Sequence, residues 1–190
     1  MKGNRSPWWI VAGCTLALAT SSGVIMAFTF SLFIEPLTNE FGWSRATVSL
    51  GFSMAALLTA ATAPLLGRLL DRVGARRTLL FAVPAYALCV VLLAATPPQA
   101  AVFFLLFALA GVAGAGHSPI AYVTLVSGWF DARRGLALGL AMSGIGIGAA
   151  LMPQLAGFII ERHGWRAAYV GLGATIFVVG LPAVALLLRE

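Results

Sequence analysis

Charged residues are scarce in this chain of 190 residues, where Asp, Glu, Lys and Arg together make up 9% of the sequence. Soluble domains carry about 25% charged residues, so this sequence cannot cover a water-facing surface with charge. Hydrophobic residues reach 61%, and the mean hydropathy is +0.97. These proportions indicate an integral membrane protein.

Cysteine and lysine are nearly absent as well. The 2 cysteines, Cys14 and Cys89, each lie inside an apolar run, which indicates neither a disulfide framework nor a cysteine-based metal site. The net charge of +6 would suit nucleic acid if it formed a patch, but the basic residues fall in short clusters between long uncharged stretches. We therefore expect no nucleic-acid partner, no metal and no cofactor, and we interpret the charge as a determinant of membrane topology.

The chain consists largely of long uncharged stretches. A helix needs about 20 apolar residues to cross the hydrocarbon core, and in lipid only helices or closed barrels satisfy the backbone. The stretches are too long for barrel strands and lack polar alternation, so we predict an all-α membrane protein. Six transmembrane helices are expected, approximately over residues 8–34, 46–66, 78–95, 100–127, 136–160 and 167–188.

Basic residues predict the orientation, because cytoplasmic loops carry an excess of Lys and Arg. With a cytoplasmic N-terminus, most of the 12 basic residues lie on the inner side, and Arg45, Arg162 and Arg166 lie on the outer side. Both termini are therefore expected in the cytoplasm. The apolar stretch after Lys2 and Arg5 runs far past the core of a signal peptide, so we expect this segment to be retained.

One pattern occurs twice in the chain. Residues 67–76 and 157–166 both read G-x-h-h-[DE]-R-x-G-x-R, where h is apolar. The first copy joins the second and third predicted spans, and the second copy joins the fifth and sixth, so each half of the chain would form a three-helix unit. Successive units with an odd number of spans cross the membrane in opposite senses, which gives the inverted repeats of many secondary transporters. Chance similarity of two arginine-bearing loops is the alternative.

The first copy of the pattern is followed by a further arginine, and its defining residues are Gly67, Asp71, Arg72, Gly74, Arg76 and Arg77. This segment resembles the loop signature between helices two and three of the major facilitator superfamily, although Ala75 stands where a basic residue is usual. The segment 42–45, GWSR, resembles the monocarboxylate and oxalate/formate-type members. Members normally carry about twelve spans, so the resemblance implies an N-terminal six-helix half, either a fragment or one of two chains that pair.

The resemblance implies a secondary active transporter, or its N-terminal half, that moves a small solute by alternating access. Small organic anions such as monocarboxylates are the first candidates, with a proton as candidate coupling ion. The implied partners are the solute, the lipid bilayer and a second six-helix bundle, and the implied location is the bacterial inner membrane. The signature loop would brace the two bundles and act as a conformational gate; topology-setting arginines with a helix cap are the alternative. A truncated or split half-transporter without activity of its own is the second reading, and an enzyme is not expected, because no acidic pair lies in mid-membrane.

Four side chains are candidates for substrate binding or proton coupling: His117, Tyr122, Thr29 and Gln154. His117 is the only ionisable residue near the middle of a predicted span, where such groups normally face a cavity or a partner. A neutral, internally bonded histidine is the alternative. Tyr122 lies about 140° further around an ideal helix, so the two share a face only if Pro119 distorts the helix. Hydroxyls such as that of Thr29 often bond to their own backbone, so only a minority should touch substrate.

Overall fold

The structure is a computed structural model and describes residues 7–187. In this part of the chain every regular element is helical and no strand occurs. Four helical segments within it are long and apolar enough to cross a membrane, namely Arg45–Val73, Ala75–Leu93, Ala100–Ser127 and Arg134–Leu186. The prediction of an all-helical membrane protein is confirmed.

The first rod of the bundle is interrupted. It comprises α1 (Trp8–Leu18), the π-helical turn η1 (Val24–Phe28) and α2 (Ser31–Phe41), whereas the sequence predicts one span over 8–34. The break falls where Thr20 follows Ala19, and the Thr20 hydroxyl donates to the carbonyl oxygen of Ala17 at 3.0 Å, a local bond that competes with helix formation. The rod then continues beyond the apolar stretch until Gly42, at φ 68°, ends it in the left-handed conformation.

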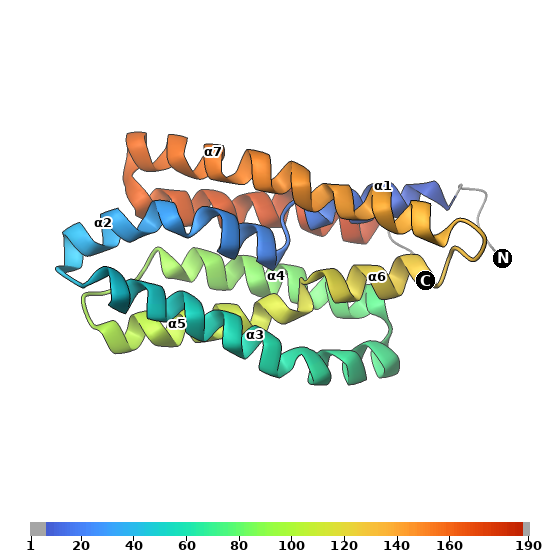
Figure 1. Ribbon diagram of the computed structural model, residues 1–190, viewed down its shortest axis with the longest axis horizontal. Coiled ribbons are helices and arrows are strands. Elements are labelled where there is room, and N and C mark those ends of the chain that lie inside the picture. Colours follow the sequence, from blue (N-terminus) through green and yellow to red (C-terminus); the bar gives the residue numbers. More distant parts are fainter. Residues whose placement is uncertain (1–6, 188–190) are drawn as a thin grey trace.

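The next two helices run in opposite directions and are joined by a tight turn (Figure 1). Ser44 caps α3 (Arg45–Val73), since its Oγ accepts a hydrogen bond from the Thr47 amide at 3.0 Å. Gly74 separates α3 from α4 (Ala75–Leu93) and has φ 90° and ψ 151°, a conformation that a side chain would strain. α3 continues past the stretch predicted over 46–66, and α4 begins before the stretch predicted over 78–95 but ends before its last residues; both extensions lie at the arginine-bearing turn around Gly74.

A second interruption divides the rod predicted over 100–127. It consists of α5 (Ala100–Gly116) and α6 (Pro119–Ser127), with His117 and Ser118 between them outside helical geometry. Pro119 is the first residue of α6, a position where its missing N–H costs nothing. The proline therefore starts a new helix here instead of kinking one continuous helix.

The last long element, α7 (Arg134–Thr175), contains a reversal. Gly164 has non-helical torsions of φ 82° and ψ 169°, close to those of Gly74, with which the repeated pattern aligns it. In Figure 1 α7 forms two rods that lie side by side, and they meet at the end opposite the α3–α4 turn. We name them the first rod of α7 (134–163) and the second rod of α7 (165–175), which η2 (Ile176–Gly180) and η3 (Ala183–Leu187) follow.

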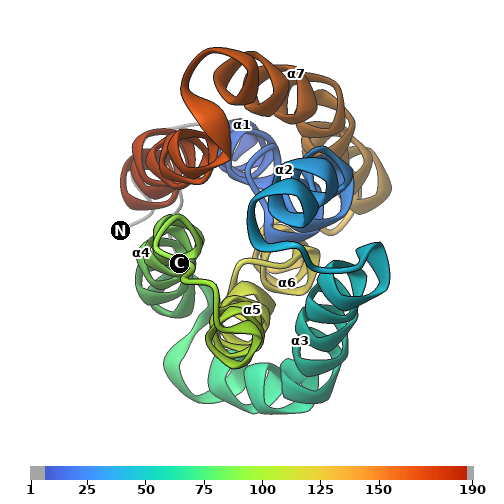
Figure 2. The ribbon, with the colours of Figure 1, turned by 90° about the vertical axis from the view of Figure 1, so that its left-hand side faces the viewer.

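The rods pack as one bundle, seen end-on in Figure 2. α1 packs mainly on α7 and α3 on α5, while α4 contacts both α5 and α7. Two glycines of α7 make the first of these contacts close: a Cβ on Gly144 would collide with the carbonyl oxygen of Thr15, and one on Gly148 with that of Ala19. These two glycines therefore allow α1 and α7 to approach each other closely.

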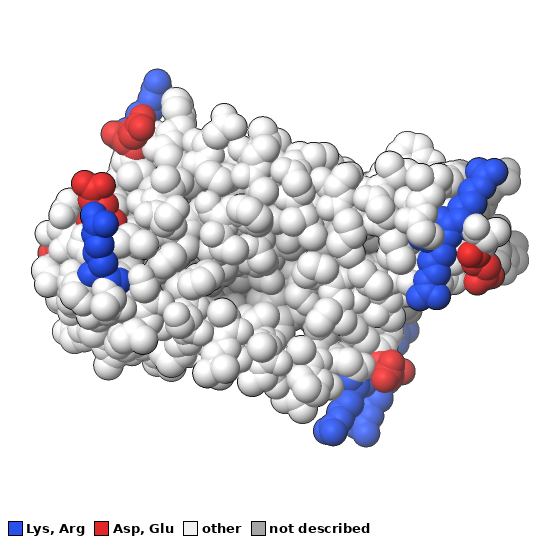
Figure 3. All heavy atoms as spheres, viewed as in Figure 1, with Lys and Arg blue, Asp and Glu red and all other residues white. Residues whose placement is uncertain are grey.

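Charged side chains gather at the two ends of the bundle, and an uncharged belt separates them on the face drawn in Figure 3. The end with the α3–α4 turn and the start of α7 carries Arg68, Arg72, Arg76, Arg77, Arg133 and Arg134. The opposite end carries Arg45, Arg162 and Arg166. The larger number of these arginines therefore lies at one end of the bundle, as the sequence predicts for the inner side of the membrane. Residues 1–6 and 188–190, which include both termini, lie outside the described part, so the orientation of the termini stays a prediction.

Candidate functional site: a crossing of two interrupted helices

His117 lies where the two interrupted rods meet, and it has no exposed surface. Its Nε2 is 3.0 Å from the carbonyl oxygen of Thr20, and its Nδ1 is 2.8 Å from the hydroxyl of Tyr122. A carbonyl oxygen can only accept, so we assign the proton to Nε2, and the Tyr122 hydroxyl donates to Nδ1. Both ring nitrogens are satisfied in the neutral form, and these are the contacts of an internally bonded histidine.

The interruption before Pro119 is what lets Tyr122 reach His117. On an unbroken helix the two side chains would diverge by about 140°. Because α6 begins anew at Pro119, Tyr122 turns back toward His117, and both are fully buried. The structure thus brings together two of the four candidates predicted from the sequence.

Hydrogen bonds join the two interruptions to each other. The Ser22 amide donates to the carbonyl oxygen of His117 at 3.1 Å, and the Tyr86 hydroxyl of α4 lies 3.5 Å from the carbonyl oxygen of Ser22. A broken helix in lipid must satisfy its freed backbone groups inside the protein, and here each break supplies partners for the other. We call these hydrogen-bonded residues the central polar cluster: Thr20, Ser22, Tyr86, His117 and Tyr122.

A cavity of about 290 Å³ lies beside the central polar cluster, between the two helix breaks and the helices α3 and α5. We call it the central cavity. Ser22, Gly23, Ser118 and Pro119 form the wall at the breaks, and Phe52 and Ala55 are among the residues of the opposite wall. Its lining is mainly small and apolar, with a few hydroxyl groups and no charged side chain. Such a lining suits a small, partly apolar molecule with one polar group.

The other two candidates lie elsewhere. Thr29 is buried, and its hydroxyl donates to the carbonyl oxygen of Ile25 at 2.6 Å. Gln154 is exposed on the first rod of α7, and its Nε2 donates to the carbonyl oxygen of Ala150 at 2.8 Å. Each side chain therefore bonds back to its own helix, and neither lines the central cavity.

The signature loop lies at the charged end of α3 and α4. Asp71, Arg72 and Arg77 are exposed, whereas Arg76 is half-buried and its Nη2 donates to the carbonyl oxygen of Ala185 at 3.0 Å. Gly67 has open space where a Cβ would stand, so close packing within the bundle does not require a glycine there. In this structure Arg76 ties the loop to η3, and the other charges of the signature face outward.

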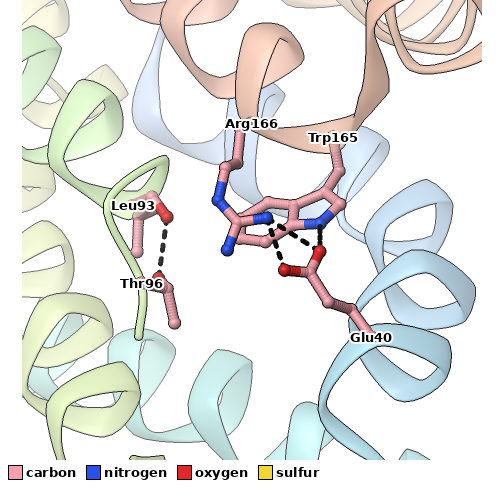
Figure 4. Close-up of polar contacts among 5 residues, drawn as sticks. All are labelled: Glu40, Leu93, Thr96, Trp165 and Arg166. Carbon is pink, nitrogen blue, oxygen red and sulfur yellow. Dashed lines mark hydrogen bonds and ion pairs between the residues drawn. The ribbon is translucent and has the colours of Figure 1, made fainter. Parts of the chain in front are cut away.

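A second polar cluster, which sequence reasoning missed, lies at the opposite end and is drawn in Figure 4. The Glu40 carboxylate accepts a hydrogen bond from the Trp165 indole at 2.6 Å and two from Arg166, at 2.6 and 2.8 Å. The Arg166 guanidinium also lies 4.2 Å from the centre of the Trp165 ring. These donors, the Trp165 indole first and then Arg166, hold the pKa of the Glu40 carboxyl below its ordinary value. The sequence gives only a weak signal for this cluster: Glu40 lies just before Gly42, and Arg166 lies just after Gly164.

Fold and site together define the class: an integral, multi-pass helical membrane protein with interrupted helices around a central cavity. The family model of the Major Facilitator Superfamily matches residues 12–190, and the chain belongs to this superfamily. This confirms the resemblance seen in the signature loop. The superfamily and the names of its relatives point to transport and not to an enzyme.

Several curated relatives are similar over most of the chain. The riboflavin transporter RibJ of Trypanosoma cruzi is 34% identical over 187 residues, which cover 91% of this chain and 39% of the relative. The oxalate:formate antiporter of Oxalobacter formigenes is 28% identical over 179 residues, 93% of this chain and 41% of the relative. Human monocarboxylate transporter 14 is 30% identical over 135 residues, 71% of this chain and 26% of the relative. The chain thus spans about two fifths or less of the length of these relatives.

Proposed function

We propose that the chain is one six-helix bundle of a secondary active transporter that moves a small solute by alternating access. The observation that carries this proposal is the central cavity at the crossing of two interrupted helices, in a chain that the superfamily matches over residues 12–190. Transporters often place their binding sites where helices are discontinuous near the middle of the bilayer. The shares of the relatives that the chain covers support assigning it to one half of the full architecture.

The six spans would be the two interrupted rods, α3, α4 and the two rods of α7. They would form two inverted three-helix units, since Gly74 and Gly164 make similar corners at opposite ends of the bundle. The end with the signature loop would face the cytoplasm of a bacterial cell, because it carries the larger share of the described arginines.

A second six-helix bundle would cover the side of the molecule where Figure 2 places α3 and the first rod of α7, with α2 and α6 between them. Small residues are exposed on both helices: Ser53, Ala56, Ala60 and Pro64 on α3, and Gly139, Ser143, Gly146 and Ala150 on α7. Small residues let membrane helices approach each other closely, whereas leucines such as Leu50 and Leu57 suit contact with lipid. The outward charges of the signature loop would then meet this second bundle and bias the conformational cycle.

The solute that this proposal favours is a small organic anion such as a monocarboxylate, in line with the names of two of the relatives. A proton is the candidate coupling ion. Protonation of His117 at Nδ1 would turn an acceptor into a donor, so the Tyr122 hydroxyl would have to rotate and accept the hydrogen bond, and this change would couple proton uptake to the surroundings of α6. Thr29 and Gln154 would contact the solute only after a rearrangement that frees them from their own helices.

Two measurements test the proposal. Proteoliposomes with the purified chain are expected to take up at least one of radiolabelled lactate, formate, oxalate or riboflavin, and a proton gradient should change the rate. Crosslinking through Gly146→Cys, with Cys14 and Cys89 replaced by serine, should join the bundle to a second one. Phe81→Cys, which is 75% exposed on α4, is the matched control that should not crosslink. A monomer that takes up none of the four solutes would instead support a half-transporter without activity of its own.

A further inference from the structure

A second hollow, of about 400 Å³, lies between α3, α4 and the last turns of α5. We call it the α3–α4 groove. α5 ends at Gly116, whereas α3 runs on to Val73 and joins α4 at Gly74. Beyond the break, α6 packs on α7, α1 and α4. The space beside the last turns of α3 is therefore left open where the rod of α5 is interrupted.

Small residues form the deeper part of the α3–α4 groove, and large residues form its rim. A Cβ on Gly116 would collide with the Cβ of Ala82, so α5 and α4 are in close contact at the bottom of the groove. Leu65, Leu69 and Phe81 also line the groove, and all three are exposed. Exposed apolar side chains of this kind mark a surface that contacts other apolar molecules. The groove therefore opens to the outside of the bundle.

The polar groups of the α3–α4 groove are already satisfied. The Thr62 hydroxyl donates to the carbonyl oxygen of Leu58 at 2.7 Å, and the Thr78 hydroxyl donates to that of Gly74 at 2.8 Å. The other lining residues are apolar. A polar solute would lose its hydrogen bonds to water here without replacing them, whereas a hydrocarbon chain has none to lose. The lining therefore favours hydrocarbon.

Two arginines continue the rim of the groove toward the Gly74 end. Arg72 lies three residues after Leu69, and Arg77 lies four residues before Phe81, spacings that place side chains on the same face of a helix. Both arginines are exposed, and neither forms an ion pair within residues 7–187. Asp71 lies about 200° around α3 from Leu69, so its negative charge is on the other side of the helix.

We propose that the α3–α4 groove binds one anionic phospholipid, with an acyl chain in the groove and the phosphate between Arg72 and Arg77. The guanidinium group matches the phosphate in charge and in hydrogen-bonding geometry. Basic pockets between membrane helices bind anionic headgroups in this way. The apolar lining alone would accept any lipid chain, and the two arginines select the anionic kind. This site does not depend on the proposed function, because it involves neither the central cavity nor a transported solute.

Photocrosslinking in nanodiscs tests the proposal. Phosphatidylglycerol with a diazirine on one acyl chain is added in small amount to the purified chain in phosphatidylcholine nanodiscs, and mass spectrometry locates the labelled residues. Label is expected at Leu65 and Phe81. Phosphatidylcholine with the same diazirine chain should label them about fivefold less, because its headgroup carries no net charge.

The chain contains a matched control groove. Phe177 lines an apolar hollow of about 350 Å³ between α4 and the second rod of α7. Arg166 lies one turn before the lining residue Val170 of this hollow, but it is paired with Glu40. Phosphatidylglycerol should therefore label Phe177 no better than phosphatidylcholine does. Equal labelling of the two grooves, or equal labelling by the two lipids, would mean general contact with the bilayer and would overturn the proposal.

Three variants separate the contribution of the headgroup from that of the acyl chain. Arg72→Gln and Arg77→Gln should each lower labelling of the α3–α4 groove by phosphatidylglycerol about fivefold. Arg133→Gln removes the same charge at the same end of the bundle, outside the groove, and should label as wild type. Ala85→Phe adds a large side chain at an exposed lining position and should displace the acyl chain while both arginines stay.

All four altered side chains are exposed, so their unfolding temperatures should equal that of wild type, and an equal value shows that a loss of label is not a loss of fold. Labelling that Arg72→Gln, Arg77→Gln or Ala85→Phe leaves unchanged would overturn the site. Displacement of the lipid by free glycerol phosphate would do the same, because it would assign the arginines to a soluble phosphate. Absent uptake of all four solutes would leave this site intact, and absent label would leave the proposed function intact.

Discussion

The contact between α1 and α7 allows a sharp test, because it depends on single hydrogen atoms at two glycines. A Cβ on Gly144 would lie 2.8 Å from the carbonyl carbon of Thr15 and 3.0 Å from its Cα, so the backbone of α1 would have to move. Overpacking of this kind costs about 1–3 kcal/mol. Alanine is a better helix former than glycine by about 1 kcal/mol. Since the collision is with backbone and not with a flexible side chain, we take the upper end of the overpacking cost, about 3 kcal/mol. Subtracting the gain in helix propensity of about 1 kcal/mol leaves an expected destabilisation of about 2 kcal/mol for Gly144→Ala.

Gly146 lies on the same helix two residues away, and a Cβ there would meet nothing within 4 Å. Gly146→Ala therefore changes only helix propensity and should leave the bundle as stable as wild type, or more stable by about 1 kcal/mol. For a domain of this size, about 2–4 °C in unfolding temperature corresponds to 1 kcal/mol. Gly144→Ala should accordingly unfold about 4–8 °C below wild type.

Cys14 provides the readout for this pair of variants. It is fully buried next to Thr15, so a thiol-reactive fluorophore reaches it only when α1 separates from the bundle. With Cys89 replaced by serine, the temperature at which Cys14 reacts measures the α1–α7 contact in detergent micelles. Equal unfolding temperatures for Gly144→Ala and Gly146→Ala would refute the close approach of α1 and α7.

Three further predictions concern other parts of the molecule. Glu40→Gln should lower the unfolding temperature at pH 7. Because folding lowers the pKa of the Glu40 carboxyl, the stability advantage of wild type should be complete above the pKa of an unfolded glutamate, about 4.3, and should vanish as the pH falls through the lower pKa of the folded state. A pH-independent difference in unfolding temperature between the two proteins would contradict this. Tyr122→Phe should destabilise the bundle by about 1–3 kcal/mol, because His117 Nδ1 loses its hydrogen-bond donor. Thr124→Val removes an exposed hydroxyl that bonds back to the carbonyl oxygen of Ile120, so it should change stability far less. Thermal unfolding followed by calorimetry or fluorescence that ranks the two variants the other way would count against the central polar cluster. Cysteines introduced at Arg72 and Arg162 should react with a membrane-impermeant maleimide from opposite sides of the bilayer, and labelling of both from one side would remove the inverted arrangement of the two corners.

The sequence predicts the class of fold well and the details of the site less well. Uncharged stretches force helices in lipid, so α3, α4 and the rods of α7 follow from composition alone. The repeated pattern predicts that Gly74 and Gly164 play the same part, and their torsions agree. The resemblance carried by the signature loop also holds, since the superfamily matches nearly the whole chain.

The interruptions are what apolar patterning could not show. A run such as 8–34 is equally apolar whether the helix continues or breaks, because the break is stabilised by hydrogen bonds to a segment distant in sequence, Ser22 to His117. One local signal was present: Ser118-Pro119 is a typical N-cap and first-position pair, and it marks the start of a helix inside the predicted span. The Glu40 cluster also joins distant segments, α2 and the second rod of α7, and no periodicity within either segment could reveal it.

The two corner glycines, Gly74 and Gly164, make similar turns in different surroundings. One corner belongs to the arginine-rich end and the other to the end with Glu40 and Trp165, so the same ten-residue design works beside quite different neighbours. What the two share is a backbone torsion, φ 90° at Gly74 and φ 82° at Gly164, and not a set of side-chain contacts. A turn encoded in a backbone torsion needs no particular headgroup, ion or aqueous compartment around it, so each corner keeps its bend at its own end of the bundle.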